Sequence, residues 1–420
     1  MLMKLLKNWF NIQQAYFKFS PFLALYILLV FLIEPHRTIL RGDESRYLDN
    51  AVSLLNGYYS PPFPNINLWS GPGYSIVLMP LMYLKLSIFY IKVLHALLQY
   101  FSLVFTYQSI RYYSSNQIAT IFCLLLGFYY PSLEMIFSVY TETLAWFLIS
   151  LLCLLTIKTI KIKGKGWGSM VLTAFVIAYL AMTKIIFGYV IVGMLLITLI
   201  FTCFQSYRTK AFKFSLIFFF ALLFCIPWLS YTYHLTHKTF YWGNSGNMSL
   251  YTMSSPYANE LGDWKTMNTL RENPNHHKFI DSLVKLYPIQ QDEAFKQQAI
   301  LNIKHHPAKY VQNWIANIGR LLFSYPNTGK SQSISTFYTL LPNMFVLVFI
   351  LIAFVIHIGY PQKVPFELFV LLLFMLVYLF GSSLVSAYRR QFFITLPFWG
   401  IYFAYFFGNL VSVKIKDIES

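Results

Sequence analysis

The 20 residues FSLIFFFALLFCIPWLSYTY at positions 214–233 contain no charged side chain. A helix of about 20 apolar residues is long enough to cross the roughly 30 Å of hydrocarbon in a bilayer. Inside that hydrocarbon, a helix satisfies its backbone hydrogen bonds within one segment. This stretch therefore predicts a transmembrane helix, and similar apolar runs recur along the chain.

The composition of the whole chain agrees with repeated membrane spans. Of the 420 residues, 57% are hydrophobic and 11% are charged, and the mean hydropathy is +0.54. Soluble domains carry about 25% charged residues. We expect an all-α polytopic membrane protein, a bundle of about ten transmembrane helices. The predicted spans are 19–33, 88–110, 117–133, 139–157, 168–183, 185–204, 214–233, 337–357, 366–383 and 391–412.

The short loops between these spans predict the topology, because Lys and Arg accumulate on the cytoplasmic side of a membrane. With the N-terminus in the cytoplasm, every short cytoplasmic loop is basic, so we expect both termini inside. The net charge of +17 then reflects topology, and we expect no nucleic-acid partner. The basic loop and tail residues are Arg111, Lys158, Lys161, Lys163, Lys165, Arg208, Lys210, Lys213, Lys363, Lys414 and Lys416.

The chain divides into three parts on this scheme. Residues 1–233 hold the first seven spans and a first outer loop, residues 34–87, in which 74–87 predicts a helix lying in the outer membrane interface. Residues 234–336 form a large extracytoplasmic loop that is partly helical, and residues 337–420 hold the last three spans and a cytoplasmic tail. Within the large loop, 291–304 and 307–323 predict helices from their apolar spacing, and we expect the loop to pack on the outer mouth of the bundle.

The stretch RGDESRY, residues 41–47, follows the first span and gathers two acids and two arginines in a chain with few charges. Asp43 and Glu44 are adjacent, so on a helix they point about 100° apart and cannot flank one bond as a glycosidase pair does. A single carboxylate that acts as a general base is the better interpretation. A solvated interfacial loop is the alternative.

Three basic residues, Lys184, Arg389 and Arg390, fall near the outer ends of spans, where the charge bias does not favour them. A charge kept near membrane depth is a functional candidate, here for an anionic lipid headgroup, and snorkelling to the interface is the alternative. Glu134 and Glu142 flank the outer turn between the third and fourth spans, where they line the same cavity or cap helices. The histidines offer no third ligand nearby, so we expect no metal site.

The order of these features resembles the GT-C glycosyltransferases, in the branch of the protein O-mannosyltransferases and the bacterial aminoarabinose transferases of lipid A (glycosyltransferase family 39-like). The lysine that the aminoarabinose enzymes carry just before the Pro turn is absent, and Ser70 and Gly71 stand there, which leaves the donor contacts open. The matching motifs are Asp43-Glu44 with Tyr47, Ala51 and Gly57; Gly71-Pro72-Gly73-Tyr74; Glu142; Pro227-Trp228; Asn302–Tyr310 with His306 in place of Asn; and Tyr388-Arg389-Arg390-Gln391 with Pro397.

The resemblance implies roles for these positions. The acidic motif Asp43-Glu44 would be catalytic, with Asp43 as the base on the acceptor. The donor phosphate would be held by basic residues: Arg46, Lys184, Arg389 and Arg390. Further residues would line the cavity: Tyr47, Glu142 and Tyr388.

The expected activity is transfer of a sugar from a polyprenyl-phosphate donor to a hydroxyl of a glycan, lipid or protein acceptor, with inversion, on the outer face of the inner (plasma) membrane. The expected partners are these substrates and membrane lipid. We expect no cofactor. A flippase or transporter of lipid-linked sugars is one alternative, and it predicts ionisable residues deep within several spans. A polysaccharide polymerase or ligase using diphosphate lipids is another, and it would need more positive charge at the site.

Overall fold

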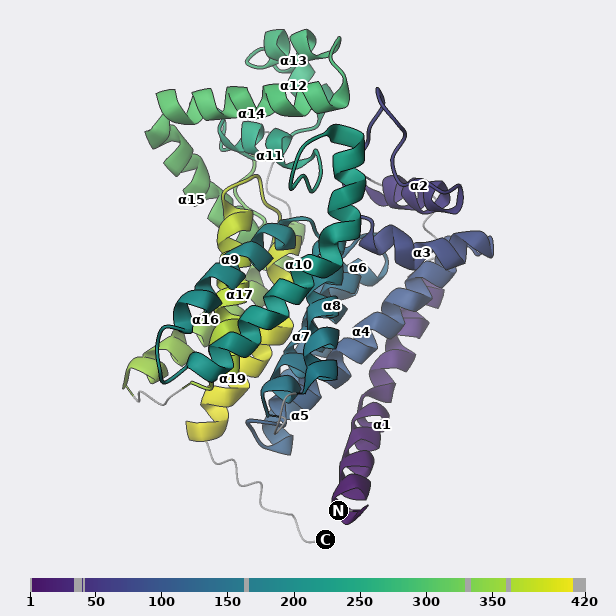
Figure 1. The fold of residues 1–420 in the computed structure, drawn as a ribbon, viewed down its shortest axis with the longest axis vertical. Helices are drawn as coiled ribbons and strands as arrows, with labels where there is room; N and C mark the ends of the chain where they lie inside the picture. Colours follow the sequence, from purple (N-terminus) through teal and green to yellow (C-terminus); the bar gives the residue numbers. More distant parts are fainter. Residues whose placement is uncertain are drawn as a thin grey trace.

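The computed structural model describes residues 2–33, 40, 42–161, 166–328, 334–359 and 364–410, without the side chains of 2–13, 335, 357, 409 and 410. Within these ranges every regular element is a helix, as the sequence predicts. Long helices form a bundle, and a layer of shorter helices covers one end of it (Figure 1). Part of the topology prediction rests on residues outside the described ones, namely Lys163, Lys165, Lys363, Lys414 and Lys416, and Arg41 of the RGDESRY stretch also lies outside them.

Six helices contain a stretch long and apolar enough to cross a membrane, and the bent pair α5 and α6, which meet at 57°, makes a seventh if it is counted as one span. The remaining three predicted spans correspond to the shorter helices α8, α9 and α19, of 17, 16 and 15 residues. Each of the ten predicted spans is therefore helical, although not all are full-length crossings. The six long helices are α1 (Leu2–Ile33), α4 (Ile88–Ile110), α7 (Glu142–Lys161), α10 (Arg208–Thr236), α16 (Phe337–Gly359) and α17 (Phe366–Ser383), and the others are α5 (Asn116–Gly127), α6 (Tyr130–Ile136), α8 (Trp167–Thr183), α9 (Ile186–Phe201) and α19 (Leu396–Leu410).

The first outer loop contains two helices, α2 (Glu44–Leu55) and α3 (Gly73–Tyr83). Figure 1 shows both lying across the upper ends of α1 and α4 rather than alongside them. The 11-residue α3 is separated from α4 by a turn at 84–87. The long apolar stretch from position 74 to 110 is thus two helices in different directions, and the placement of α3 in the membrane interface stays a prediction.

The large loop forms the layer at the end of the bundle (Figure 1). Its helices surround a small apolar core of their own, which includes Tyr251, Leu270 and Phe295. The two predicted helices are confirmed, although the first begins three residues earlier than position 291. The helices of this layer are α11 (Gly246–Met253), α12 (Met267–Glu272), α13 (His277–Leu283), α14 (Pro288–His305) and α15 (Pro307–Phe323).

Helix α15 buries its polar face, and this face forms hydrogen bonds with residues 383–387, which precede the last two helices. Asn313 and Asn317 are fully buried, while Val311 and Ile315 of the apolar stripe are exposed. The side chain of Asn317 donates to the carbonyl oxygens of residues 383 and 385, at 2.7 and 2.6 Å, and accepts from the N–H of residue 387 at 2.9 Å. This clamp fixes the backbone just before α18 (Arg389–Phe393).

Candidate functional site

Charged residues from four distant segments form a chain of alternating sign. Asp43 precedes α2, Glu142 opens α7, Lys184 lies between α8 and α9, and Arg390 lies on α18. Arg46 and Arg390 contact the two oxygens of Asp43, with N–O distances of 2.9 and 3.3 Å. Arg390 Nε and Lys184 Nζ contact Oε1 of Glu142 at 3.6 and 2.8 Å. The structure therefore brings together five of the residues that the sequence predicts for the site.

The two adjacent acids of the motif point to different places. Asp43 is 27% exposed and lines a cavity of about 1090 Å³. Glu44 is fully buried, and its Oε1 accepts the backbone N–H of Val139 at 2.8 Å. Glu44 thus ties α2 to the turn before α7, whereas Asp43 is accessible to a ligand in the cavity.

The two guanidinium groups that hold Asp43 are braced by aromatic rings. Arg390 lies 5.0 Å from the ring centre of Tyr140 and 5.2 Å from that of Tyr388, and Arg46 lies 5.1 Å from the ring centre of Trp69. Such cation–π contacts stabilise the charge and limit the rotamers of the side chain. Tyr388, a predicted lining residue, therefore lines the large cavity and positions Arg390.

Arg389, the neighbour of Arg390 on α18, takes a different partner. Its Nη2 lies 2.8 Å from Oε2 of Glu134, and it also donates to the hydroxyl of Thr339. Arg389 and Glu134 line the same large cavity as Asp43. Arg389 is thus a third cation of the cavity wall beside Arg46 and Arg390, and it is held by a separate acid.

Glycines place the first outer loop against the residues that precede Lys184. A Cβ atom added to Gly71 would lie 2.1 Å from the carbonyl oxygen of Met182, and one added to Gly73 would lie 2.6 Å from the hydroxyl of Thr183. Only glycine fits so close an approach. The Gly-Pro-Gly turn of the sequence therefore packs against the C-terminal end of α8.

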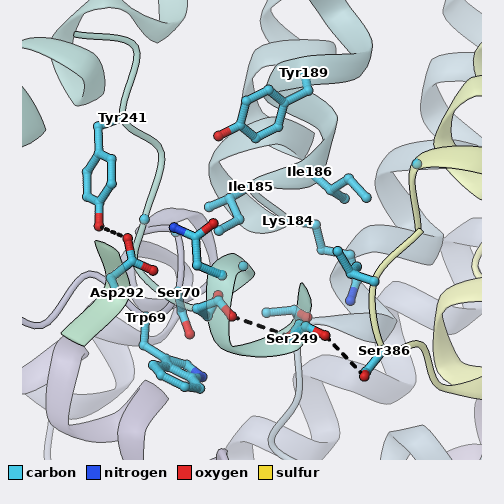
Figure 2. Close-up of a pocket in the computed structure, with 18 of the residues that line it drawn as sticks. Trp69, Ser70, Lys184, Ile185, Ile186, Tyr189, Tyr241, Ser249, Asp292 and Ser386 are labelled. Atoms are coloured by element: carbon cyan, nitrogen blue, oxygen red, sulfur yellow. Dashed lines mark hydrogen bonds between the residues drawn. The ribbon is translucent and has the colours of Figure 1, made fainter. Parts of the chain in front are cut away.

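A second cavity of about 670 Å³ lies on the Lys184 side of the charge chain. Figure 2 shows its wall, to which Trp69, Lys184, Tyr241 and Asp292 contribute. The two cavities share a set of lining residues. These are Trp69, Ser245, Ser249, Ser386 and Gln391.

Two of the predicted lining residues are buried beside the charge chain. Glu142 is 1% exposed, so its carboxylate is an anchor for Lys184 and Arg390 and not a surface of the cavity. Tyr47 lines the second cavity. Burial, followed by the negative charges of Glu142 and Asp43, raises the pKa of Tyr47 to about 12. Its hydroxyl therefore keeps its proton at neutral pH.

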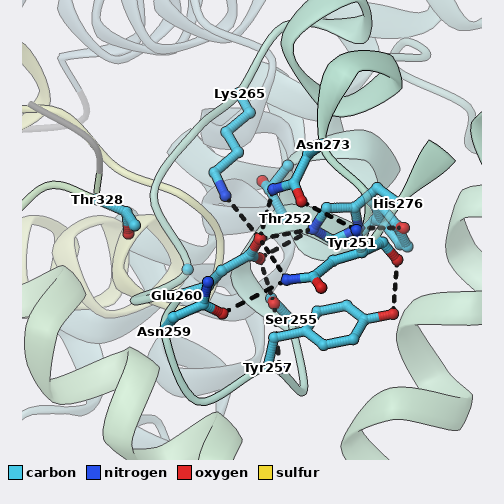
Figure 3. Close-up of polar contacts among 12 residues, drawn as sticks. Tyr251, Thr252, Ser255, Tyr257, Asn259, Glu260, Lys265, Asn273, His276 and Thr328 are labelled. Carbon is cyan, nitrogen blue, oxygen red and sulfur yellow. Dashed lines mark hydrogen bonds and ion pairs between the residues drawn. The ribbon is translucent and has the colours of Figure 1, made fainter.

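A buried polar network holds the loop that forms part of the large cavity (Figure 3). Glu260 accepts hydrogen bonds from Ser255, His276 and Lys265. The loop continues to Trp264, whose ring lies 5.9 Å from that of Trp69, and Trp264 lines the large cavity. The network thus fixes an aromatic wall next to Arg46.

Several site residues escape sequence reasoning. Trp69 stands two residues before the Gly-Pro-Gly turn, one of the matching motifs, but its position against Arg46 has no sequence signal. Tyr140 and Asp292 carry none either, because aromatic residues are abundant in the chain and Asp292 lies in a loop of mixed charge. Among the described residues, no group of three or more His, Cys, Asp and Glu could hold a metal ion.

Comparisons with known proteins find a similar solved structure. No family model matches the chain, and no curated protein matches it in sequence. The chain is similar to the crystal structure of ArnT from Cupriavidus metallidurans bound to undecaprenyl phosphate, with 13% identity, a TM-score of 0.44, and coverage of 93% of this chain and 77% of that one. A likeness of this strength assigns no family and no activity to the chain.

Proposed function

We propose that this protein is a membrane glycosyltransferase that moves a sugar from a polyprenyl-phosphate donor to an acceptor hydroxyl, with Asp43 as the general base. One observation carries the proposal: an accessible carboxylate in the wall of a cavity of about 1090 Å³ lies between the guanidinium groups of Arg46 and Arg390. Such a site combines a proton acceptor with donors for an anionic leaving group. These are the two functions that transfer from a lipid phosphate requires.

The reaction balances with these residues alone. Asp43 takes the proton of the acceptor hydroxyl while the acceptor oxygen forms a bond to the anomeric carbon. The bond from that carbon to the phosphate oxygen breaks, and its electron pair stays on the lipid phosphate. Attack from the face opposite the phosphate inverts the anomeric centre. Arg46 and Arg390 stabilise the charge that grows on the phosphate.

The contacts of Asp43 suggest that donor binding activates the base. Both of its carboxylate oxygens are engaged by guanidinium groups. A phosphate competes for the same planar forks of donors. When the donor phosphate takes either guanidinium, one oxygen of Asp43 becomes free to accept the proton of the acceptor.

The other predicted residues flank this centre. Lys184 and Arg389 each contact an acid, Glu142 and Glu134, and each lines one of the two cavities. We propose that these two cations add to the positive electrostatic potential around the donor phosphate. Glu44, buried against the backbone of Val139, is assigned to the packing of α2 and not to catalysis.

A transferase that uses diphosphate lipids is the second candidate. Six basic side chains line the two cavities, which is two more than the sequence predicts for the site: Arg46, Lys184, Lys238, Lys296, Arg389 and Arg390. Each of them also contacts an acid, and this favours a single phosphate as the ligand. The flippase alternative is less favoured, because Asp43, Glu142 and Lys184 lie at helix ends and not deep within spans.

The test uses the full-length protein in liposomes with a panel of polyprenyl-phosphate sugars and candidate acceptors. We expect sugar loss from one donor with the wild type and its absence with a folded Asp43→Asn variant. Full transfer by Asp43→Asn would overturn the mechanism. Turnover of diphosphate donors alone would favour the second candidate, and lipid movement across the liposome without turnover would favour the flippase.

A further inference from the structure

The second cavity contains a buried carboxylate oxygen that lacks a partner. Asp292 lies on α14 and is 3% exposed. Its Oδ2 accepts a hydrogen bond from the hydroxyl of Tyr241 at 2.8 Å, whereas its Oδ1 has no hydrogen-bond partner within the described part of the chain. Figure 2 shows this second oxygen directed into the cavity, on the side of Ser70. A buried acceptor left unpaired is unfavourable because it loses its hydrogen bonds to water, so this oxygen points to a ligand.

The neighbouring charges restrict the chemistry of that ligand. Glu293, the next residue, holds Lys238 at 3.1 Å and Lys296 at 3.6 Å, so the nearby ammonium groups already have an acid. Two carboxylates disfavour an anion at this wall, and the lysines disfavour a cation. A neutral molecule with hydrogen-bond donors is left as the best match.

The protonation of Asp292 agrees with this chemistry. Burial raises the pKa of Asp292, and this outweighs the lowering by the Tyr241 hydroxyl, Asn247 and Lys238. Burial therefore outweighs the hydrogen bonds and the positive charge that favour the ionised form of Asp292. A hydroxyl group that donates to Oδ1 would stabilise the ionised form.

Other lining groups suit a sugar. Trp69 lines both large cavities and also a third one of about 270 Å³, in whose wall Asp292 and Asn244 lie. The amide oxygen of Asn244 is a second buried acceptor without a partner among the described residues. The hydroxyls of a sugar can donate to these oxygens, and its apolar face can pack on the ring of Trp69.

We propose that Asp292, together with Trp69 and Asn244, binds a neutral polyhydroxylated sugar beside the transfer site. The inference rests on the proposed function for the origin of this sugar, which is either the sugar of the lipid donor or a glycan acceptor. The same hydrogen-bond chemistry applies to both. All three residues line the cavity of about 270 Å³, and Trp69 and Asp292 also line the second cavity. Asp43 and Arg390 face the larger cavity.

The test measures sugar binding directly, by saturation-transfer NMR on the full-length protein in nanodiscs. The probes are the methyl glycosides of glucose, galactose, mannose, N-acetylglucosamine and arabinose. We expect at least one to bind the wild type, and Asp292→Leu to weaken that binding about ten-fold or more, since a hydrogen bond to a charged group is lost. Tyr241→Phe is the matched control, because it removes the partner of Oδ2 and leaves Oδ1 in place.

Asp292→Asn provides a second variant should the leucine variant fail to fold. It keeps the size of the side chain and loses the charge, so we expect binding to weaken several-fold. The inference would be overturned if no glycoside bound the wild type, or if the wild type and the Asp292 variants bound the glycoside equally.

Two further arms separate this inference from the proposed function and identify the source of the sugar. Undecaprenyl phosphate, which carries no sugar, should bind the wild type and Asp292→Asn equally, and its binding tests the phosphate site alone. If the wild type binds undecaprenyl phosphate but no glycoside, only the sugar site is overturned. If it binds a glycoside but not undecaprenyl phosphate, only the proposed phosphate site is overturned. In the transfer assay, Asp292→Asn is compared with the wild type. A raised KM of the variant for the lipid donor would assign the sugar to the donor, and a raised KM for the acceptor would assign it to the acceptor.

Discussion

The guanidinium group of Arg390 lies 3.3 Å from Oδ2 of Asp43, although the two residues are 347 positions apart in the chain. The same guanidinium group lies 3.6 Å from Glu142. Arg390 is therefore shared between an accessible acid and a buried one. A phosphate that takes it from Asp43 leaves it anchored by Glu142, so the cation stays in place when the base is released.

Replacement of Arg390 by Lys should reduce both phosphate binding and transfer. Lysine keeps the charge but is a point donor without the planar fork that spans two acids. We expect undecaprenyl phosphate affinity to fall about ten-fold, with a larger loss of transfer rate. Arg389→Lys is the matched control on the same helix, where the pair with Glu134 is separate. Equal losses in the two variants would contradict the proposal that Arg390, shared between Asp43 and Glu142, holds the phosphate in a way that Arg389 does not.

The adjacent acids Asp43 and Glu44 should separate activity from stability. Asp43→Asn removes the proposed base and should lower transfer about 10²–10⁴-fold with little change in unfolding temperature. Glu44→Gln weakens a buried contact to the N–H of Val139 and should reduce the free energy of unfolding by about 1–3 kcal/mol while the folded fraction stays active. Transfer assays and thermal unfolding of both variants provide the comparison, and the opposite pattern would exchange their roles.

Glu142 and Lys184 should behave as a coupled pair. Glu142 is 1% exposed and lies 2.8 Å from Lys184. Lys184→Met leaves the buried carboxylate with Arg390, at 3.6 Å, as its cationic partner among the described residues, so we expect a loss of about 3 kcal/mol in stability. Glu142→Gln combined with Lys184→Met should recover part of that loss. A double-mutant cycle on thermal unfolding measures the coupling, and additive effects would show that the pair is independent.

The approach of the first outer loop to α8 can be tested with two glycines. Gly71→Ala would place a methyl group 2.1 Å from the carbonyl oxygen of Met182, so the backbone must shift, and we expect a loss of about 1–3 kcal/mol. Gly168→Ala on α8 meets nothing within 4 Å and should be neutral, or more stable by up to about 1 kcal/mol. An unchanged unfolding temperature in Gly71→Ala would show that this packing is looser.

The network around Glu260 should make the large loop sensitive to acid. Burial would raise the pKa of Glu260, but hydrogen bonds from His276, Ser255 and Lys265 outweigh it and hold the pKa below its ordinary value. A carboxyl whose folded pKa is depressed contributes stability above its unfolded pKa, near 4.3, and that stability is lost as the pH falls towards the folded pKa.

We therefore expect the protection of α11–α13 against hydrogen exchange, relative to the intrinsic rate at each pH, to fall below about pH 5 in the wild type. Glu260→Gln should exchange faster at neutral pH and show a shallower dependence on pH. Identical pH profiles in the two proteins would contradict the role of the carboxylate.

The sequence is most informative where charge is scarce. Apolar runs predict the helices, and Asp43, Arg46, Lys184 and Arg390 stand out because a charge at the outer end of a span needs a reason. Periodicity also predicts α15, but it does not predict which face is buried. The apolar face of an amphipathic helix ordinarily packs on the core. Helix α15 instead leaves Val311 and Ile315 exposed and buries Asn313 and Asn317, which donate hydrogen bonds to backbone carbonyls.

Other features depend on tertiary contacts that no local pattern encodes. The inward turn of Glu44 follows from the position of the Val139 N–H, which comes from the distant turn before α7. The unpaired oxygen of Asp292 follows from the geometry of Tyr241, which supplies one donor for two acceptor atoms. Both are properties of packing between segments and not of the residues that neighbour them in sequence.

The charge chain also has an order of synthesis. Asp43, Glu142 and Lys184 leave the ribosome long before Asn317 and Arg390. A nascent chain arrested before α18 contains most of the bundle but lacks Arg390. Among the charged residues of the site, Asp43 then pairs with Arg46 alone, and Glu142 pairs with Lys184 alone. The site is therefore completed late in biogenesis, and a truncated protein can be inserted and largely folded without ever assembling it.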